Sequence, residues 1–457
     1  MAMSESAMAQ NDDVLDATLN EQIVYIPANW LGLVRLEVTL FKPNGDGPFP
    51  LAIINHGVSP GNSHKASRNR SEYLTHYFLS RGYAVILPML RGYAGSDGRS
   101  LDKTCDAEAD GLDQADDIEH VLRYVESHPE VGVKVDKDHV VVAGQSMGGW
   151  HALALGTRDL PELKGVINFV GTRRAEICPG WEQGLISSSA AFGRKTHKPS
   201  IWFYGDNDKL TPTKTWHAMF DAYNAAGGSA ELVAYGPFMT DAHNLLGKIE
   251  GLPIWVPKLD AFLKKIGMPY QSVAPELFPA PYPLPTQFSS AFDVDAIPLV
   301  NDRSRQDYRN FLIKEMPRVF MISTNGFAVI TSGGYDPMAR AFALCAKQNL
   351  RCQPYAIDND VVWPQPLPIP APTQFAKLDD VTAVPYMTDA GRKGYARFLA
   401  LPEPKAFVIA PDGSWSLSSR DFDVLKSALQ NCSAKHAQCG VYAVNSDVVW
   451  QGVDQHP

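Results

Sequence analysis

Residues 140–149 read VVVAGQSMGG, and this short stretch decides the fold. Its β-branched start predicts a strand, and residues 149–157 predict the start of a helix. Between them, residues 144–148 fit the pattern G-x-S-x-G, in which a serine occupies a sharp, strained turn between small neighbours. Because this pentapeptide also occurs by chance in glycine-rich turns, the rest of the chain must supply the partners that would make Ser146 a nucleophile.

On both sides of this turn, residues 20–267 alternate between strand-like and helix-like segments. The chain has 457 residues, 45% of them hydrophobic and 20% charged, which is ordinary for a globular protein of two or three domains. Strands are predicted at 21–26, 34–41, 49–57, 83–92, 139–143, 163–171, 199–208 and 230–236, and helices at 71–82, 111–128, 149–157, 211–228 and 254–267. This alternation predicts an α/β domain with a mostly parallel central sheet covered by helices.

The composition argues against two classes of partner. The formal net charge is −9, and the densest basic stretches, residues 65–70 and 194–198, are short enough to be solvated loops, so no nucleic acid is expected. No run of about 18 apolar residues occurs, so no membrane span is predicted. Residues 1–19 are predicted to be a flexible N-terminus, in which residues 7–9 (AMA) fit the end of a secretory signal and an ordinary tail equally well.

A serine nucleophile needs a base, and the base needs a carboxylate that fixes its tautomer. On this kind of turn the three residues follow the chain order serine, acid, histidine. Asp206 and Asp208 both lie at the end of a predicted strand, and either could be the acid. His243 follows the next strand on a loop, whereas His217 lies inside a predicted helix and could hardly reach back. We therefore expect His243 to be the base of Ser146.

Two backbone N–H groups are also needed to stabilise the oxyanion that forms during acyl transfer. One is expected from Met147, which directly follows the candidate nucleophile. The other should come from the loop after the strand that ends at residues 55–57 (NHG), which makes Val58 the candidate. His56 in that loop is either a second base or, as we prefer, a structural residue that packs under the site.

Residues 20–267 resemble the dienelactone hydrolase and prolyl-oligopeptidase-like branch of the α/β-hydrolases. The resemblance rests on NHG (55–57), RGYAGSDG (91–98), GQSMGG (144–149), YGDNDKLTP (204–212) and DAH (241–243). It implies the α/β-hydrolase fold, and the family pattern G-x-x-D at residues 205–208 favours Asp208 over Asp206. Dienelactone hydrolases proper have a cysteine in place of Ser146, and the oligopeptidases carry an N-terminal propeller with no counterpart here, so the resemblance points toward a serine esterase.

The predicted activity is hydrolysis of carboxylic esters through an acyl-enzyme, with Ser146 as nucleophile, His243 as general base and Asp208 orienting it. No metal or cofactor is expected. A peptidase or amidase with the same three residues is one alternative. A polymer- or partner-binding protein with a relic hydrolase fold is another.

The segment from residue 171 to residue 198 is a short insertion, which favours an open site for small-molecule or polymeric esters. Trp181 and Phe192 are candidates for lining the pocket, and Arg173 and Arg174 for meeting an anionic group of the substrate. The alternative for all four residues is ordinary packing or solvated surface.

Beyond the hydrolase-like domain (20–267) and a proline-rich linker (268–285), the sequence repeats itself. CAKQNLRCQPYAIDNDVVW (345–363) matches CSAKHAQCGVYAVNSDVVW (432–450), and PYPLPTQF (281–288) matches PIPAPTQF (368–375), both at an offset of 87 residues. We predict two small tandem α+β modules, residues 286–363 and 364–457, of unassigned family. They could pair two copies of the chain into a homodimer.

Six cysteines suggest the compartment. Within each module two cysteines stand seven residues apart, Cys345 with Cys352 and Cys432 with Cys439, and the repetition favours disulfides over buried free thiols. Cys105 and Cys178 are the two remaining cysteines and would form a third pair. Disulfides imply an oxidising compartment, so we predict a periplasmic or secreted protein.

Overall fold

The computed structural model describes residues 14–28, 34–58, 63–99, 105–173 and 177–453. The boundary between two compact units falls between Ala280 and Pro281. We call the first unit, from residue 14 to residue 280, the N-terminal domain. Arg174 and residues 7–9, both singled out above, lie outside the described residues.

An eight-stranded sheet forms the centre of the N-terminal domain, in the order β1-β2-β4-β3-β5-β6-β7-β8. Strands β1 and β2, and likewise β2 and β4, pair antiparallel, while every neighbouring pair from β4 to β8 is parallel. The strands are β1 (Gln22–Pro27), β2 (Arg35–Phe41), β3 (Phe49–Asn55), β4 (Ala84–Pro88), β5 (Val135–Gln145), β6 (Leu163–Phe169), β7 (Pro199–Tyr204) and β8 (Ser229–Ala234). The predicted fold class is confirmed.

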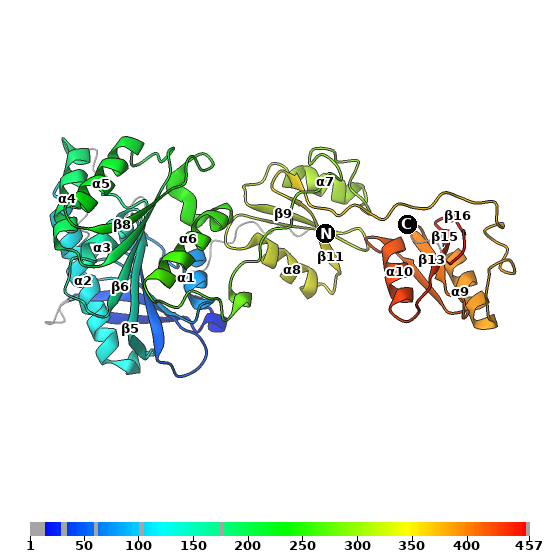
Figure 1. Cartoon of the computed structure of the whole chain (residues 1–457), viewed down its shortest axis with the longest axis horizontal. Coiled ribbons are helices and arrows are strands. Elements are labelled where there is room, and N and C mark those ends of the chain that lie inside the picture. Colours follow the sequence, from blue (N-terminus) through cyan, green and yellow to red (C-terminus); the bar gives the residue numbers. More distant parts are fainter. Residues whose placement is uncertain (1–13, 29–33, 59–62, 100–104, 174–176, 454–457) are drawn as a thin grey trace. The chain divides into compact units, whose positions relative to one another are not determined.

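Helices cover both faces of this sheet, with α2, α4 and α5 on one side and α1 and α6 on the other (Figure 1). Because both faces are covered, the central strands are apolar throughout, as in Val140–Val142, all fully buried. The helices are α1 (Glu72–Leu79), α2 (Ala107–Ser127), α3 (Met147–Leu155), α4 (Trp181–Lys195), α5 (Thr213–Ala225) and α6 (Leu252–Lys265). Short 3-10 helices are Ala17–Leu19, Ser63–Lys65, Pro129–Val131, Ala242–Gly247, Ile249–Gly251 and Pro275–Leu277.

Helix α4 is an element that the sequence analysis treated only as an insertion. Its apolar side chains at Trp181, Leu185 and Phe192 belong to or pack against the main core, together with residues of α2 and α5. Leu185 and Phe192 are fully buried. The spacing of these three residues and the Gly180 N-cap indicate a helix, and they were the signal available in the sequence.

The N-terminal domain extends further at both ends than the sequence indicates. The 3-10 helix Ala17–Leu19 buries Leu19, so the chain is already structured before residue 20. In the proline-rich segment, the N–H groups of Val273 and Ala274 both donate to the Ser80 carbonyl, at 2.8 and 3.0 Å. Residues 268–280 therefore belong to the domain and are not a free linker.

The two C-terminal modules have the same element order. The first contains α7 (Asp302–Phe311), β9 (Arg318–Ser323), β10 (Ala328–Ser332), α8 (Pro337–Lys347), β11 (Cys352–Ile357) and β12 (Asp360–Val361). The second contains α9 (Asp389–Ala400), β13 (Lys405–Ile409), β14 (Trp415–Ser419), α10 (Val424–Ser433), β15 (Gly440–Val444) and β16 (Asp447–Val448). Their antiparallel sheets, β10-β9-β11-β12 and β14-β13-β15-β16, also correspond strand by strand.

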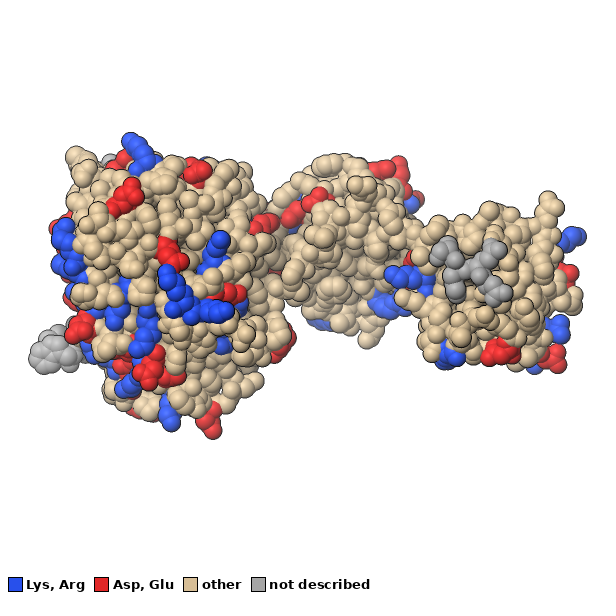
Figure 2. Space-filling model, viewed as in Figure 1, with Lys and Arg blue, Asp and Glu red and all other residues tan. Residues whose placement is uncertain are grey.

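Three disulfides join the six cysteines. Cys345–Cys352 and Cys432–Cys439 each begin in the last turn of a helix; Cys352 is the first residue of β11, and Cys439 directly precedes β15. Cys105–Cys178 connects the segments before α2 and α4. Within the described ranges, no helix is both long enough and apolar enough to cross a membrane. Figure 2 shows basic and acidic side chains interspersed over the face of the N-terminal domain that it displays.

Candidate active site

Ser146 occupies the turn between β5 and α3 in a strained backbone conformation, with φ 56° and ψ −126°. The turn is held from both sides, because the Ser146 N–H donates to the Phe169 carbonyl at 2.9 Å and the Ser146 carbonyl accepts from Thr172 N–H at 3.1 Å. A Cβ at Gly148 would lie 2.1 Å from the Asn55 carbonyl oxygen, and one at Gly144 would lie 2.2 Å from the Gly148 carbonyl oxygen. Only glycine fits these two positions, which is the geometry that the G-x-S-x-G pattern requires.

Asp208 and His243 meet at the ends of neighbouring parallel strands, β7 and β8. His243 Nδ1 lies 2.9 Å from Asp208 Oδ2, and the other carboxylate oxygen accepts the N–H groups of Leu210 and Thr211 at 2.7 and 2.9 Å. The Asp208 side chain is fully buried, whereas Asp206 is exposed. The structure thus pairs Asp208, and not Asp206, with His243.

His243 is fixed along its backbone as well as through its ring. Its carbonyl accepts Gln145 Nε2 at 2.6 Å, and its N–H donates to Asp241, which caps the 3-10 helix Ala242–Gly247. Its Nε2 is buried and has no hydrogen-bond partner among the described residues. With Nδ1 bound to a carboxylate, Nε2 is the nitrogen available to take a proton. His217 is exposed on α5, with its ring stacked on Trp216 at 3.8 Å.

Ser146 and His243 open into the same cavity, which has a volume of about 620 Å³ and which we call the Ser146 cavity. It lies at the carboxyl edge of the parallel strands, where this class of fold places its ligands. The lining residues are His56, Gly57, Val58, Ser67, Arg68, Asn69, Met89, Gln145, Ser146, Met147, Thr172, Arg173, Leu210, His243 and Asn244. The described residues contain no group of three or more His, Cys, Asp or Glu side chains that could hold a metal ion.

The two expected oxyanion donors both line this cavity. Met147 is the first residue of α3, and N–H groups in the first turn of a helix are not used by the helix itself. A Cβ at Gly57 would lie 3.3 Å from Ser146 Cβ, so the loop that carries Val58 runs directly against the nucleophile.

His56 takes the structural role that we preferred. Its Nδ1 donates to the Gly57 carbonyl at 2.7 Å, and its Nε2 accepts Leu90 N–H at 3.0 Å, so both ring nitrogens are occupied. Burial lowers the pKa of His56 to about 4, which keeps the ring neutral near pH 7. A neutral ring with both nitrogens occupied stabilises the loop and is a poor base.

Of the residues predicted to contact the substrate, some line the Ser146 cavity and others do not. Arg173 lines the Ser146 cavity. Trp181 and Phe192 do not: Phe192 is fully buried with its ring centroid 5.0 Å from that of Trp150, and Trp181 packs against the same core. Their expected place in the pocket is corrected to a packing role, because the side chains of both residues belong to or pack against the main core.

Arg68 is not predicted from the sequence, in which residues 65–70 resemble a solvated loop. Its side chain is only 6% exposed and lines the Ser146 cavity. The available signal was positional, since these polar residues follow a predicted strand at the edge of the sheet where the nucleophile lies.

Comparisons with known proteins found similarities over part of the chain. Residues 32–196 match the model of the X-Pro dipeptidyl-peptidase family (S15 family). No curated protein matches the chain. Solved structures that it resembles include a putative dienelactone hydrolase from Klebsiella pneumoniae (19% identity, 54% of this chain, 98% of that chain, TM-score 0.40). Another is an esterase from Pyrococcus furiosus (16% identity, 55% of this chain, 95% of that chain, TM-score 0.39). A third is a puromycin-hydrolyzing peptidase from Mycobacterium tuberculosis (17% identity, 54% of this chain, 39% of that chain, TM-score 0.39). The sheet order of the N-terminal domain is that of the α/β-hydrolase fold.

Proposed function

We propose that the N-terminal domain is a serine hydrolase that cleaves carboxylic esters. One observation carries this: His243 is bound through Nδ1 to a buried carboxylate, while its unpartnered Nε2 belongs to the same cavity as Ser146. A base oriented in this way and placed beside a serine on a strained turn is the arrangement that acyl transfer needs.

In the proposed reaction, Ser146 Oγ attacks the ester carbonyl carbon while His243 Nε2 takes its proton. The carbonyl oxygen becomes an oxyanion, which the N–H groups of Met147 and Val58 stabilise. The tetrahedral intermediate then collapses, and His243 gives its proton to the leaving alcohol. After the alcohol has left, water attacks the acyl-serine while His243 Nε2 takes a proton from it. The second tetrahedral intermediate collapses, the carboxylic acid is released, and His243 returns the proton to Ser146 Oγ.

The charge of the cavity favours an ester over the substrate named by the matching family. A dipeptidyl-peptidase acts at a free N-terminus, whose ammonium group needs a carboxylate or similar acceptor nearby. The described residues that line the Ser146 cavity include Arg68 and Arg173 but neither Asp nor Glu. A peptidase that uses the same three residues is the second candidate, and the S15 family match of residues 32–196 is the observation in its favour.

The test has two arms, both on the full chain. A fluorophosphonate probe should label the protein, and Ser146→Ala should abolish the labelling, whereas Ser187→Ala, on the exposed side of α4, should not. Matched p-nitrophenyl esters and p-nitroanilides of varied acyl length should show faster ester hydrolysis. Clearly faster anilide turnover would establish the peptidase, and absence of labelling would favour a relic fold with a binding role.

We also propose that the protein works in an oxidising compartment, as in the periplasm or outside the cell. The disulfides in both C-terminal modules and in the N-terminal domain support this, because such bonds rarely persist in a reducing cytosol.

A further inference from the structure

The Ser146 cavity has a one-sided charge. Among the described residues that line it, the charged side chains are those of Arg68 and Arg173. Both are almost fully buried, with 6% and 5% of their side chains exposed. A buried guanidinium is costly unless its N–H groups find acceptors, so an N–H group that lacks an acceptor is a place to look for a ligand.

Arg173 lies beside the nucleophile and has an N–H group to spare. The preceding residue, Thr172, donates its N–H to the Ser146 carbonyl at 3.1 Å. Arg173 Nε donates to Asp110 Oδ2 at 2.9 Å, but its Nη2 is buried with no partner among the described residues. Thr172 also lines the cavity, and its hydroxyl is likewise buried with no partner among the described residues. Arg173 Nη2 and the Thr172 hydroxyl are therefore two buried donors for which a ligand could supply the acceptor.

The position of Arg173 is enforced from outside the cavity. Asp110 lies in α2 and is buried, and it also lies 3.4 Å from His151 Nε2 in α3. The Cys105–Cys178 disulfide connects the segment before α2 to the loop that carries Arg173. Tyr204 adds a hydrogen bond from its hydroxyl to the Gly171 carbonyl at 2.6 Å. Asp110 is thus a positioning residue for Arg173.

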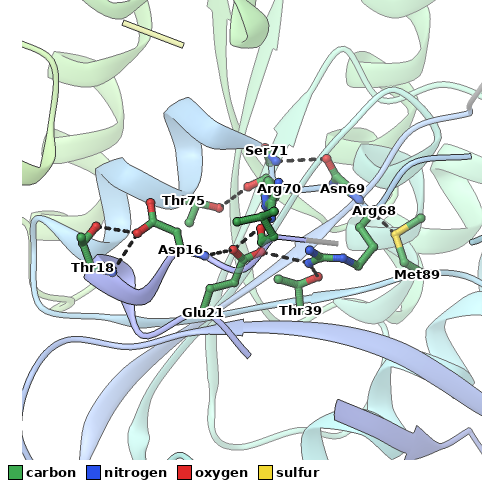
Figure 3. Close-up of polar contacts among 11 residues, drawn as sticks. Asp16, Thr18, Glu21, Thr39, Arg68, Asn69, Arg70, Ser71, Thr75 and Met89 are labelled. Carbon is green, nitrogen blue, oxygen red and sulfur yellow. Dashed lines mark hydrogen bonds and ion pairs between the residues drawn. The ribbon is translucent and has the colours of Figure 1, made fainter. Parts of the chain in front are cut away.

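Arg68 is held in a comparable way by Glu21, whose side chain is fully buried. Figure 3 shows Arg68 and Arg70 converging on Glu21. Arg68 Nη1 donates to Glu21 Oε1 at 2.9 Å and to Thr39 Oγ1 at 3.0 Å, and Arg70 Nε donates to the same carboxylate oxygen at 2.7 Å. Glu21 thus holds the Arg68 guanidinium at the wall of the Ser146 cavity, and the same carboxylate also binds Arg70.

We propose that Arg173 and Arg68 bind a carboxylate of the substrate, so that the preferred ester carries a free carboxylate on its acyl or its alcohol part. This rests on the proposed ester hydrolysis. A planar carboxylate matches the donor geometry of a guanidinium, and it supplies the acceptor that Arg173 Nη2 lacks. When the substrate carboxylate binds to these arginines near Ser146, the ester carbonyl is also oriented toward the nucleophile.

The experiment compares charged and neutral esters of nearly equal size on the full chain. One pair, p-nitrophenyl hemiglutarate and its methyl ester, places the carboxylate on the acyl part. The other, 4-acetoxybenzoate and its methyl ester, places it on the alcohol part. In at least one pair, kcat/KM should be at least about tenfold higher for the charged ester, and the responding pair identifies the part of the ester that carries the carboxylate.

Arg173→Gln should bring this charged-to-neutral ratio down toward one, and Arg68→Gln should lower it as well. Arg123→Gln is the matched control, since Arg123 forms an exposed ion pair with Glu119 in α2, and it should keep the native ratio. If Arg173→Gln folds poorly, inhibition of the native protein tests the same proposal. Glutarate should inhibit hydrolysis of a neutral ester competitively, and glutaramide should not.

Equal or faster turnover of both neutral esters by the native protein would overturn the proposal, provided that Ser146→Ala abolishes that turnover. A charged preference that survives both arginine substitutions would overturn the assignment of these residues. Absence of any Ser146-dependent ester hydrolysis would instead contradict the proposed function itself.

Discussion

Asp208 and His243 are 35 residues apart in the chain, yet Asp208 Oδ2 and His243 Nδ1 lie 2.9 Å apart. They meet because β7 and β8 run parallel, which brings the loops after both strands to one edge of the sheet. In the proposed reaction, this contact fixes the tautomer of the imidazole and balances the charge that the ring gains.

Asp208→Asn should lower kcat by about 10³- to 10⁴-fold, because the amide favours the wrong tautomer of His243. Asp206→Asn is the matched control, since Asp206 is exposed two residues away and makes no contact with His243. Steady-state kinetics on a p-nitrophenyl ester measure both variants. Equal losses in the two would show that the carboxylate of Asp208 has no special role.

Gly148→Ala should abolish ester hydrolysis and destabilise the domain, because the new Cβ would lie 2.1 Å from the Asn55 carbonyl. The clash forces apart the Ser146 turn and the loop that carries Val58. Gly184→Ala in α4 is the control, since a Cβ there meets nothing within 4 Å, and it should stabilise the helix by up to about 1 kcal/mol. Thermal unfolding and activity assays distinguish the two; an active Gly148→Ala protein would contradict the geometry of the turn.

Glu21→Gln should lower the free energy of unfolding by about 3–5 kcal/mol, because it leaves Arg68 and Arg70 buried without their carboxylate. Glu119→Gln, which breaks the largely exposed pair with Arg123, should cost under about 1 kcal/mol. Urea unfolding at pH 7 measures both.

The cost of Glu21→Gln should also depend on pH. Burial alone would raise the pKa of Glu21, but hydrogen bonds from Arg70, the Asp16 N–H and Arg68 outweigh it and hold the pKa below its ordinary value of 4.5. A carboxylate with a lowered pKa contributes stability above pH 4.5 that is lost as the pH falls through the lowered value. The difference between native and variant should therefore shrink in acid, and a constant difference would contradict the ion pairs.

His56 should make the N-terminal domain sensitive to mild acid. Its pKa falls from 6.5 in the unfolded chain to about 4 in the folded one because the ring is buried, so the unfolded state binds the extra proton between these values. The stability should be complete above about pH 6.5 and fall as the pH drops toward 4, by at most on the order of 3 kcal/mol.

His56→Gln, whose amide can still donate to Gly57 and accept from Leu90, should remove most of this dependence in unfolding experiments between pH 4 and 7. His197→Gln, at an exposed position, should leave it unchanged. An unchanged acid dependence in His56→Gln would show that another group is responsible.

Disulfide removal should affect the two kinds of loop differently. In the chain-entropy model, Cys105–Cys178, with a sequence separation of 73, should contribute about 4 kcal/mol, and Cys432–Cys439, with a separation of 7, about 2 kcal/mol. Paired Cys→Ser variants and thermal unfolding measure this. A thiol titration of the denatured, unreduced protein should find no more than two free thiols, whereas five or six would contradict both the disulfides and the proposed export.

Much of the site follows from the sequence alone because its determinants are local. The glycines at 144 and 148 predict a turn that only small residues permit. Each candidate partner of Ser146 follows a strand that its run of apolar residues predicts. In a parallel sheet, the ends of such strands must meet at one edge, so chain order predicted which loops approach one another. The offset of 87 residues likewise predicted two similar modules before any contact was known.

The tertiary structure decided what depends on distant packing. It buried Arg68 against Glu21, although both stretches of sequence resemble ordinary surface. It turned Trp181 and Phe192 into the core, because α4 packs between α2 and α5, and it left Arg173 with an open donor beside Ser146. Burial and hydrogen-bond satisfaction depend on residues brought together from remote parts of the chain, so they cannot be predicted from local pattern. These properties, more than the serine turn itself, support the proposed preference for an ester that carries a carboxylate.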